Sequence, residues 1–219
     1  MALSHEEARA FYDRFGSKQD WQRFYEDRSV RELVAHGRFN EAQSVLEFGC
    51  GTGRLAEMLL TDHLPATARY AGLEISATMT SLAGTRLARF GPRVKVRLTE
   101  GGMGLNGDSG TYDRFLATYV LDLLSEGDIR ALLLEAHRAL VPKGLLLLVS
   151  LTHGTTFFSR LVERAWMALY AIRPRLVGGC RPISLLEFTD EGMWQTLHHV
   201  RTGQFGLVSE VLVAERRPS

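Results

Sequence analysis

Three glycines that alternate with other residues, preceded by an acid, are the part of this chain best suited to bind a ligand. They lie in the sequence VLEFGCGTG, residues 45–53. Glycine adopts positive φ at little cost and has no Cβ, so a ligand can lie directly against the backbone there. Apolar residues before the turn predict a short strand, and those after it predict a helix through Leu60. The free N–H groups at the start of that helix point toward the same place.

The spacing of the glycines discriminates between two kinds of nucleotide ligand. The dinucleotide fingerprint G-x-G-x-x-G requires a small residue at position 54, where this chain has Arg54. Glu47, at the carboxyl end of the predicted strand, would repel a pyrophosphate and attract a cation. S-Adenosylmethionine carries an ammonium and a sulfonium group and no phosphate, so it suits this turn better than a nicotinamide dinucleotide does.

Residues 45–53 closely resemble motif I of the class I S-adenosylmethionine-dependent methyltransferases. The resemblance covers about residues 40–216 and is strongest at 45–83 and 112–151. It implies an α/β fold with a Rossmann-like seven-stranded sheet in the order 3-2-1-4-5-7-6, its last strand antiparallel and its helices on both faces. It implies S-adenosyl-L-methionine as cofactor and S-adenosyl-L-homocysteine as product. The residues expected to bind the cofactor in this motif are Glu47, Gly49, Cys50, Gly51, Thr52 and Gly53.

A second acid, Glu74, ends the next predicted strand, Arg69–Glu74. It follows Gly51 at about the 20-residue spacing at which an acid reaches the ribose in nucleotide-binding βαβ units. Two ribose hydroxyls can donate to one carboxylate. The resemblance gives an acid here the same role. We therefore expect Glu74 to bind the ribose, with Ile75 or Met79 beside the adenine.

The adenine-binding position departs from the pattern of the family that the chain resembles. Related enzymes carry an Asp-Ala pair after the third strand, predicted here at 93–99. This chain has Gly101 at the Asp position and Glu100 one place earlier. Either a side chain or the backbone of Gly101 and Gly102 would then contact the adenine.

Two aromatic helices are predicted ahead of the first strand. Residues 5–16 place apolar side chains at i, i+3, i+4 and i+7, and a second helix follows a break near residue 16. In the methyltransferases that this chain resembles, such helices cover the cofactor, and a Tyr-Asp pair like Tyr12-Asp13 lies near it. The alternative is that Tyr12, Trp21 and Phe24 only pack against the core.

The transferable methyl group is expected at the end of the fourth predicted strand, 112–119. Its last residues, Thr118 and Tyr119, resemble motif IV of the family but lack the Asn/Asp-Pro-Pro-Tyr signature of amino methylation. The resemblance implies that Thr118 contacts the cofactor. Methyl transfer is an in-line displacement that can rest on alignment alone, so a base is required only if the acceptor must lose a proton. His153, after the buried strand 145–151, is the leading candidate because histidine acts near neutral pH. Tyr119 and Asp122 are rivals, better suited to position the acceptor.

The segment 152–192 is longer than a crossover between strands requires. Residues 157–172 predict a long apolar helix with charged residues on the opposite side. We interpret the segment as a lid over the acceptor site. The alternatives are a crossover helix packed on the core and a basic amphipathic surface that contacts membranes. Residues 193–219 predict the closing pair of strands, joined near Gly203.

Length and composition predict one domain of 219 residues. The motifs and the resemblance divide it into a helical cap (1–40), a cofactor-binding core (41–151), the lid (152–192) and the closing strands (193–219). The net charge of +1 argues against nucleic-acid binding. Two cysteines form no disulfide framework or metal cluster, and His198 and His199 face opposite ways on a strand, so no metal is expected. Charged residues near the start exclude a signal peptide, and we expect a cytoplasmic protein.

The favoured hypothesis is a methyltransferase acting on a small, hydrophobic or lipid-like acceptor. One alternative is a relative that binds the cofactor without catalysis, as a partner subunit. A nicotinamide-dependent oxidoreductase is a third hypothesis, which Arg54 disfavours.

Overall fold

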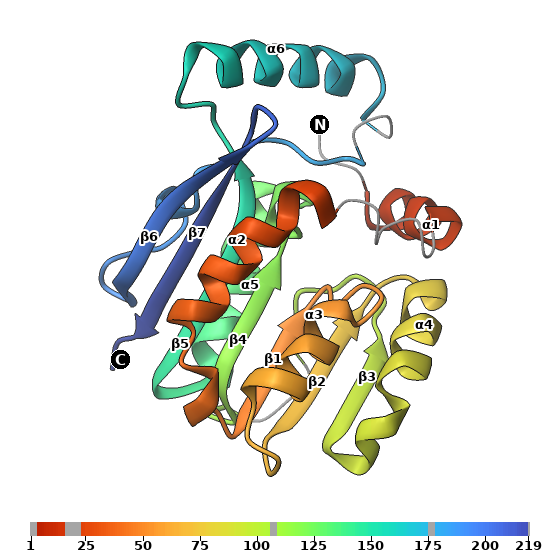
Figure 1. The fold of residues 1–219 in the computed structure, drawn as a ribbon, viewed down its shortest axis with the longest axis vertical. Helices are drawn as coiled ribbons and strands as arrows, with labels where there is room; N and C mark the ends of the chain where they lie inside the picture. The colour runs from red at the N-terminus through yellow and green to blue at the C-terminus, as the bar shows by residue number, and fades with distance from the viewer. Residues whose placement is uncertain (1–3, 16–22, 106–108, 175–177, 219) are drawn as a thin grey trace.

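The computed structural model describes residues 4–15, 23–105, 109–174 and 178–218. Its strands form one sheet in the order β3-β2-β1-β4-β5-β7-β6, with β1 to β5 parallel and β7 antiparallel to both of its neighbours (Figure 1). This order confirms the predicted Rossmann-like fold. The strands are β1 (Ser44–Phe48), β2 (Arg69–Glu74), β3 (Val94–Leu98), β4 (Tyr112–Thr118), β5 (Leu140–Thr152), β6 (Trp194–Gln204) and β7 (Leu207–Arg216).

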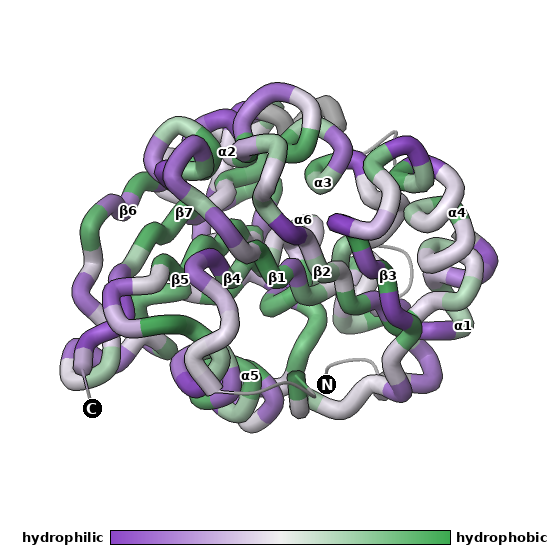
Figure 2. The backbone as a smooth tube through the Cα atoms, turned by 90° about the horizontal axis from the view of Figure 1, so that it is seen from below, coloured by the Kyte–Doolittle hydropathy of each residue, from purple (hydrophilic) through white to green (hydrophobic). Residues whose placement is uncertain are grey.

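Helices cover both faces of the sheet because its central strands are apolar on both sides. On β1, Val45 packs toward α2 and α3, while Leu46 packs toward α5. Figure 2 shows the hydrophobic stretches in the strands between these two helical layers. The α-helices are α1 (His5–Phe15), α2 (Arg23–His36), α3 (Arg54–Met58), α4 (Ala77–Leu87), α5 (Glu126–Ala139) and α6 (Phe157–Ile172).

Two turns differ from the sequence prediction. Residues 142–144, ahead of the predicted strand 145–151, form a bulge inside β5, which begins at Leu140; Lys143 has φ 64° and the pairing with β4 shifts register here. The last two strands are joined not at Gly203, which pairs with Val208, but by Phe205 and Gly206, both at positive φ. Two consecutive residues at positive φ are the requirement of a two-residue hairpin turn that matches strand twist.

Helix α1 closes over the carboxyl ends of β2 and β3. Asp13 accepts a hydrogen bond from the Ser76 hydroxyl at 2.6 Å and one from the Thr78 N–H at 3.3 Å. The Arg9 guanidinium donates to the Thr99 carbonyl at 3.4 Å. The predicted break near residue 16 and Trp21 lie outside the described residues.

Helix α6 lies beyond the carboxyl ends of the strands, next to the hairpin that joins β6 and β7 (Figure 1). Thr156 and Ser159 form a capping box that begins the helix. Phe157 and Ile172 are 88% and 74% exposed, so the apolar residues that predicted this helix do not all face the core. Among the described residues, no helix is both long and apolar enough to cross a membrane.

Candidate active site

The glycine turn after β1 has the backbone geometry that its sequence predicts. Gly49, Gly51 and Gly53 have φ of 74°, 53° and 76°. The N–H groups of Gly49 and Cys50 both donate to the Leu73 carbonyl, at 2.8 and 3.1 Å, and so tie the turn to β2. Backbone atoms, rather than side chains, therefore form this wall of the site.

Little room exists for side chains at two of these glycines. A Cβ at Gly49 would lie 2.4 Å from a methyl carbon of Val120, and one at Gly53 would lie 3.1 Å from the Cβ of Ala83 in α4. Gly53 thus lets α3 and α4 approach each other closely.

Two acids are buried beside the turn. Glu74 is 6% exposed, and its carboxylate accepts hydrogen bonds from the N–H groups of Gly51 at 2.8 Å and of Ile75 and Ser76 at 2.9 Å. Glu47 is 2% exposed and accepts one from the Tyr70 hydroxyl at 2.5 Å.

The electrostatics of these acids favour a cation. Burial raises the pKa of Glu47 to about 7; the Tyr70 hydroxyl opposes this shift and the charge of Glu74 adds to it. Burial also raises the pKa of Glu74, against the three backbone N–H groups. Within the described part of the chain, neither carboxylate forms an ion pair with a Lys or Arg. A cationic ligand would therefore supply the missing positive charge.

Two cavities meet at this edge of the sheet. The larger, about 820 Å³, lies beneath α1, and the smaller, about 520 Å³, is lined by the glycine turn and Glu47. Gly49, Thr118 and Tyr119 line both, so the two cavities adjoin.

Most of the predicted site residues line one of these cavities. Those around the larger cavity are Tyr12, Gly49, Glu74, Ile75, Met79, Gly101, Thr118 and Tyr119. Those around the smaller cavity are Glu47, Gly49, Cys50, Gly51, Thr52, Thr118 and Tyr119. Gly53, Gly102 and His153 are not among the lining residues of either cavity.

Gly101 stands at the predicted adenine-binding position, where related methyltransferases carry an Asp. It has φ 94° and is buried against the larger cavity, while Gly102 and Glu100 are exposed. Thr99 and Met103, which sequence reasoning missed, line the same wall. Only the position of these residues after β3 pointed toward the site.

Tyr119, which lines both cavities, has φ 55°, and its hydroxyl shares a hydrogen bond with Ser209 Oγ at 2.9 Å.

Asp122, the other predicted acceptor-positioning residue, is fully buried and lines neither cavity. Its carboxylate accepts a hydrogen bond from the Leu151 N–H at 3.2 Å, and burial raises its pKa to about 7. Asp128, near the start of α5, does line the cavity. No pattern along the chain distinguishes Asp128 from other acids at helix starts.

His153 lies at the end of β5, with its side chain 57% exposed. Its Nδ1 is 2.7 Å from Glu163 of α6, which also accepts a hydrogen bond from the Gly154 N–H at 2.8 Å. These contacts hold the imidazole against α6 rather than in the cavity. Its role as a base stays a prediction.

Residues 45–144 match a protein family described as a methyltransferase domain. No curated protein matches the chain. This match includes motif I and agrees with the resemblance seen there, and the sheet order is that of the Rossmann-like methyltransferase fold.

Several solved structures share the fold. The N-methyltransferase NodS from Bradyrhizobium japonicum WM9, in complex with S-adenosyl-L-homocysteine, is 16% identical over 88% of this chain and 87% of its own, with a TM-score of 0.64. Geranyl diphosphate C-methyltransferase from Streptomyces coelicolor A3(2) is 15% identical over 87% and 79%, with a TM-score of 0.67. The cyclase SpnF is 17% identical over 88% and 82%, also with a TM-score of 0.67.

Proposed function

We propose that this protein transfers a methyl group from S-adenosyl-L-methionine to a small, hydrophobic or amphipathic acceptor. The observation that carries the proposal is the pair of buried acids, Glu47 and Glu74, beside a turn of bare backbone. Neither has a basic partner among the described residues. Such a site suits a cationic nucleoside and disfavours a diphosphate.

The residues present fit the cofactor in two parts. Glu47 and the glycine turn, around the smaller cavity, would hold the methionine portion with its ammonium group. Glu74 would hold the ribose: three of the roughly four acceptor positions of its carboxylate are used by backbone N–H groups, which leaves one for a hydroxyl. Ile75, Met79 and Gly101 would flank the adenine.

The bound cofactor supplies a methyl group already activated by its positive sulfur. The protein then has to align the acceptor and exclude water, which can lower the barrier by several kcal/mol. Tyr119 and Thr118, which line both cavities, would position the acceptor where the two cavities meet. If the acceptor must lose a proton, Asp128 lines the cavity and His153 lies farther out, against Glu163.

The hydrophobic character of the acceptor is supported by the surroundings of Tyr119. Tyr119 and Leu123, both in the cavity wall, pack in a cluster with Trp166 of α6 and Leu207 of the hairpin. The Trp166 indole N–H donates to the Cys180 carbonyl at 2.9 Å, which fixes α6 to the segment that follows it. We propose that the segment 152–192 acts as the lid of the acceptor site.

A second candidate is a protein that binds the cofactor without transferring its methyl group. The fold itself favours keeping this candidate, because SpnF, with a TM-score of 0.67 to this chain, is named a cyclase. The cofactor site alone does not distinguish the two candidates, since both require it.

Thermal shift and isothermal titration test the cofactor. S-Adenosyl-L-homocysteine at 100 times its Kd should add about 2.7 kcal/mol of stability, whereas NAD should add none. The opposite ranking would support the nicotinamide-dependent oxidoreductase and overturn the proposal.

Transfer of a labelled methyl group into an extract then separates the two candidates. A labelled product in the organic phase supports a hydrophobic acceptor. Cofactor binding with no labelled product across fractions would favour the non-catalytic candidate.

A further inference from the structure

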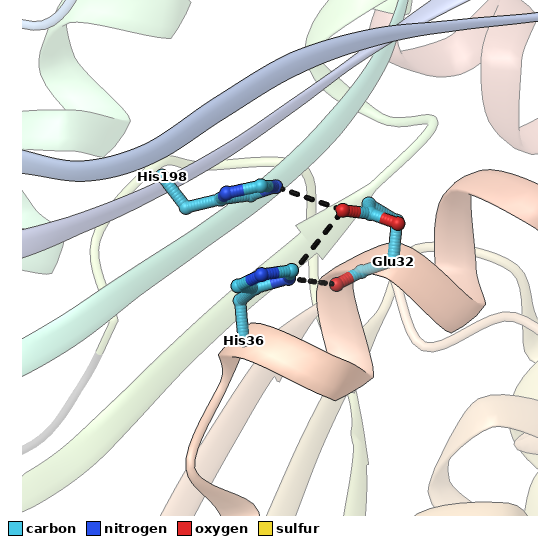
Figure 3. Close-up of side chains that lie close together, drawn as sticks. All are labelled: Glu32, His36 and His198. Carbon is cyan, nitrogen blue, oxygen red and sulfur yellow. Dashed lines mark hydrogen bonds and ion pairs between the residues drawn. The ribbon is translucent and has the colours of Figure 1, made fainter.

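Three side chains from α2 and β6 converge outside the cofactor site (Figure 3). The Glu32 carboxylate oxygen Oε1 lies 3.5 Å from Nδ1 of His36 and 3.0 Å from Nε2 of His198. The two imidazole rings stack with centroids 3.6 Å apart and planes within 5°. One ligand atom from each of the three residues lies within 4.8 Å of the others.

The fold brings these residues together from distant parts of the sequence. Glu32 and His36 are four residues apart and so share one face of α2. His198 faces α2 from β6, where Ser29 and Thr202 also join the two elements through a hydroxyl–hydroxyl contact of 2.7 Å. His199 points the other way, to the buried Glu210. The two adjacent histidines face opposite ways, as the sequence predicted; the expectation of no metal rested on that pair and on the cysteines, and did not consider α2.

The polar atoms of this cluster are incompletely satisfied by one another. His198 Nε2 is buried and has no hydrogen-bond partner in the described part of the chain, although it lies 3.0 Å from Glu32 Oε1. A nitrogen and a carboxylate oxygen this close, without a hydrogen bond between them, can share a metal ion as well as form an ion pair.

We propose that Glu32, His36 and His198 bind a divalent transition-metal ion such as Zn²⁺. Zinc–nitrogen and zinc–oxygen bonds of about 2.0–2.2 Å place tetrahedral ligand atoms about 3.3–3.6 Å apart. Glu32 Oε1 lies 3.0 Å from His198 Nε2 and 3.5 Å from His36 Nδ1, so side-chain movements can bring the three groups to this spacing. Two imidazoles and one carboxylate are a zinc ligand set, whereas Mg²⁺ and Ca²⁺ prefer oxygen ligands alone.

The partly exposed position of the cluster lets a metal enter and water complete its coordination. His36 Nδ1 also lies 3.0 Å from the Glu32 backbone carbonyl. Because the His36 ring is exposed, rotation about its side-chain bonds can break this hydrogen bond and the ring stacking, and can turn a ring nitrogen toward the metal.

The bound ion would join α2 to β6. Since Val30 of α2 lines the smaller cavity, the ion would also steady one wall of that cavity.

Titration of the full-length protein, freed of any affinity tag and of metal, tests the proposal without reference to methyl transfer. We expect ZnCl₂ to bind with one high-affinity site and MgCl₂ not to compete. Co²⁺ should give the visible absorption of a four-coordinate ion. Removing even an outer contact of a metal site costs about 10–100-fold in affinity, so His198→Ala should weaken zinc binding about tenfold or more.

His63→Ala is the matched control, since His63 is exposed and outside the cluster; its zinc affinity should equal that of the wild type. If His198→Ala does not fold, His36→Gln, at an exposed position, takes its place. Equal zinc affinity for the wild type and the cluster variant would overturn the proposal. So would a Co²⁺ spectrum unchanged by the substitution.

Discussion

Two regions at the carboxyl edge of the sheet are built in different ways. At the cofactor edge, residues 47–53 and 73–79, backbone groups make most of the polar contacts, and the two acids are almost fully buried. On the α6 side, residues 153–172 and 205–207, large apolar side chains reach the surface; Phe157 is 88% exposed. Backbone geometry tolerates few substitutions, whereas exposed side chains tolerate many. We infer that cofactor recognition is built into the fold, and that the acceptor is chosen on the α6 side.

Gly49→Ala is the most severe test of the cofactor edge. The new Cβ would lie 2.4 Å from Val120, and the residue would keep φ near 74°. Backbone strain and overpacking each cost about 1–3 kcal/mol, so unfolding in urea should show a loss of about 2–6 kcal/mol.

Gly84→Ala in α4 is the matched control, because no atom lies within 4 Å of its added Cβ. It should stabilise the protein by up to about 1 kcal/mol. Similar effects of the two substitutions would mean that the glycine turn is not specially constrained.

Glu47→Gln tests the buried charge at the cofactor edge. The pKa of Glu47 is about 7 in the fold against 4.5 ordinarily, so the unfolded chain loses its proton first as pH rises. The contribution of Glu47 to the wild-type free energy of unfolding should therefore fall by about 3 kcal/mol as the pH rises from about 4.5 to 7.

The glutamine variant should lack this part of the decline when urea unfolding is followed from pH 5 to 8. Asp122, whose pKa burial also raises to about 7, contributes in the same direction and remains in the variant. An identical pH profile in both proteins would contradict the buried, raised pKa of Glu47.

Glu74→Gln tests whether the second acid binds the ribose. It removes one charge-assisted hydrogen bond to the ribose, worth about 1.5–3 kcal/mol, and one of the two oxygens that accept from backbone N–H groups. S-Adenosyl-L-homocysteine should therefore bind at least roughly 10–100-fold more weakly by titration calorimetry. Glu100→Gln, at an exposed position outside the cavities, should bind it normally. Unchanged affinity in the Glu74 variant would remove its ribose role.

The smallest effects on stability and cofactor binding are expected from substitutions on the α6 side. Phe157→Ser and Ile172→Ser replace exposed residues, so the free energy of unfolding should stay within about 0.5 kcal/mol of wild type. Cofactor affinity should also stay unchanged, while methyl transfer to a hydrophobic acceptor should fall through a raised KM. A loss of cofactor binding would mean that the two regions are not separable.

Much of the architecture was predictable from local patterns. The alternation of Gly49, Gly51 and Gly53, the continuous apolar run of β5 and the acids at strand ends predicted the first strand-turn-helix unit, the buried strand and most of the cavity lining. The sheet order followed from the resemblance to methyltransferases. The turn at Phe205-Gly206 was misplaced, because hairpin register depends on pairing across β6 and β7 rather than on the nearest glycine.

By itself, the sequence determined the strand-turn-helix unit and the acid at the carboxyl end of each of the first two strands, because strand periodicity and glycine conformation act over a few residues. Only the tertiary structure decided that His198 meets Glu32 and His36, that His153 pairs with Glu163, and that Asp122 is buried. Those outcomes depend on how separate elements pack, and no spacing along the chain encodes which side chains will then face one another.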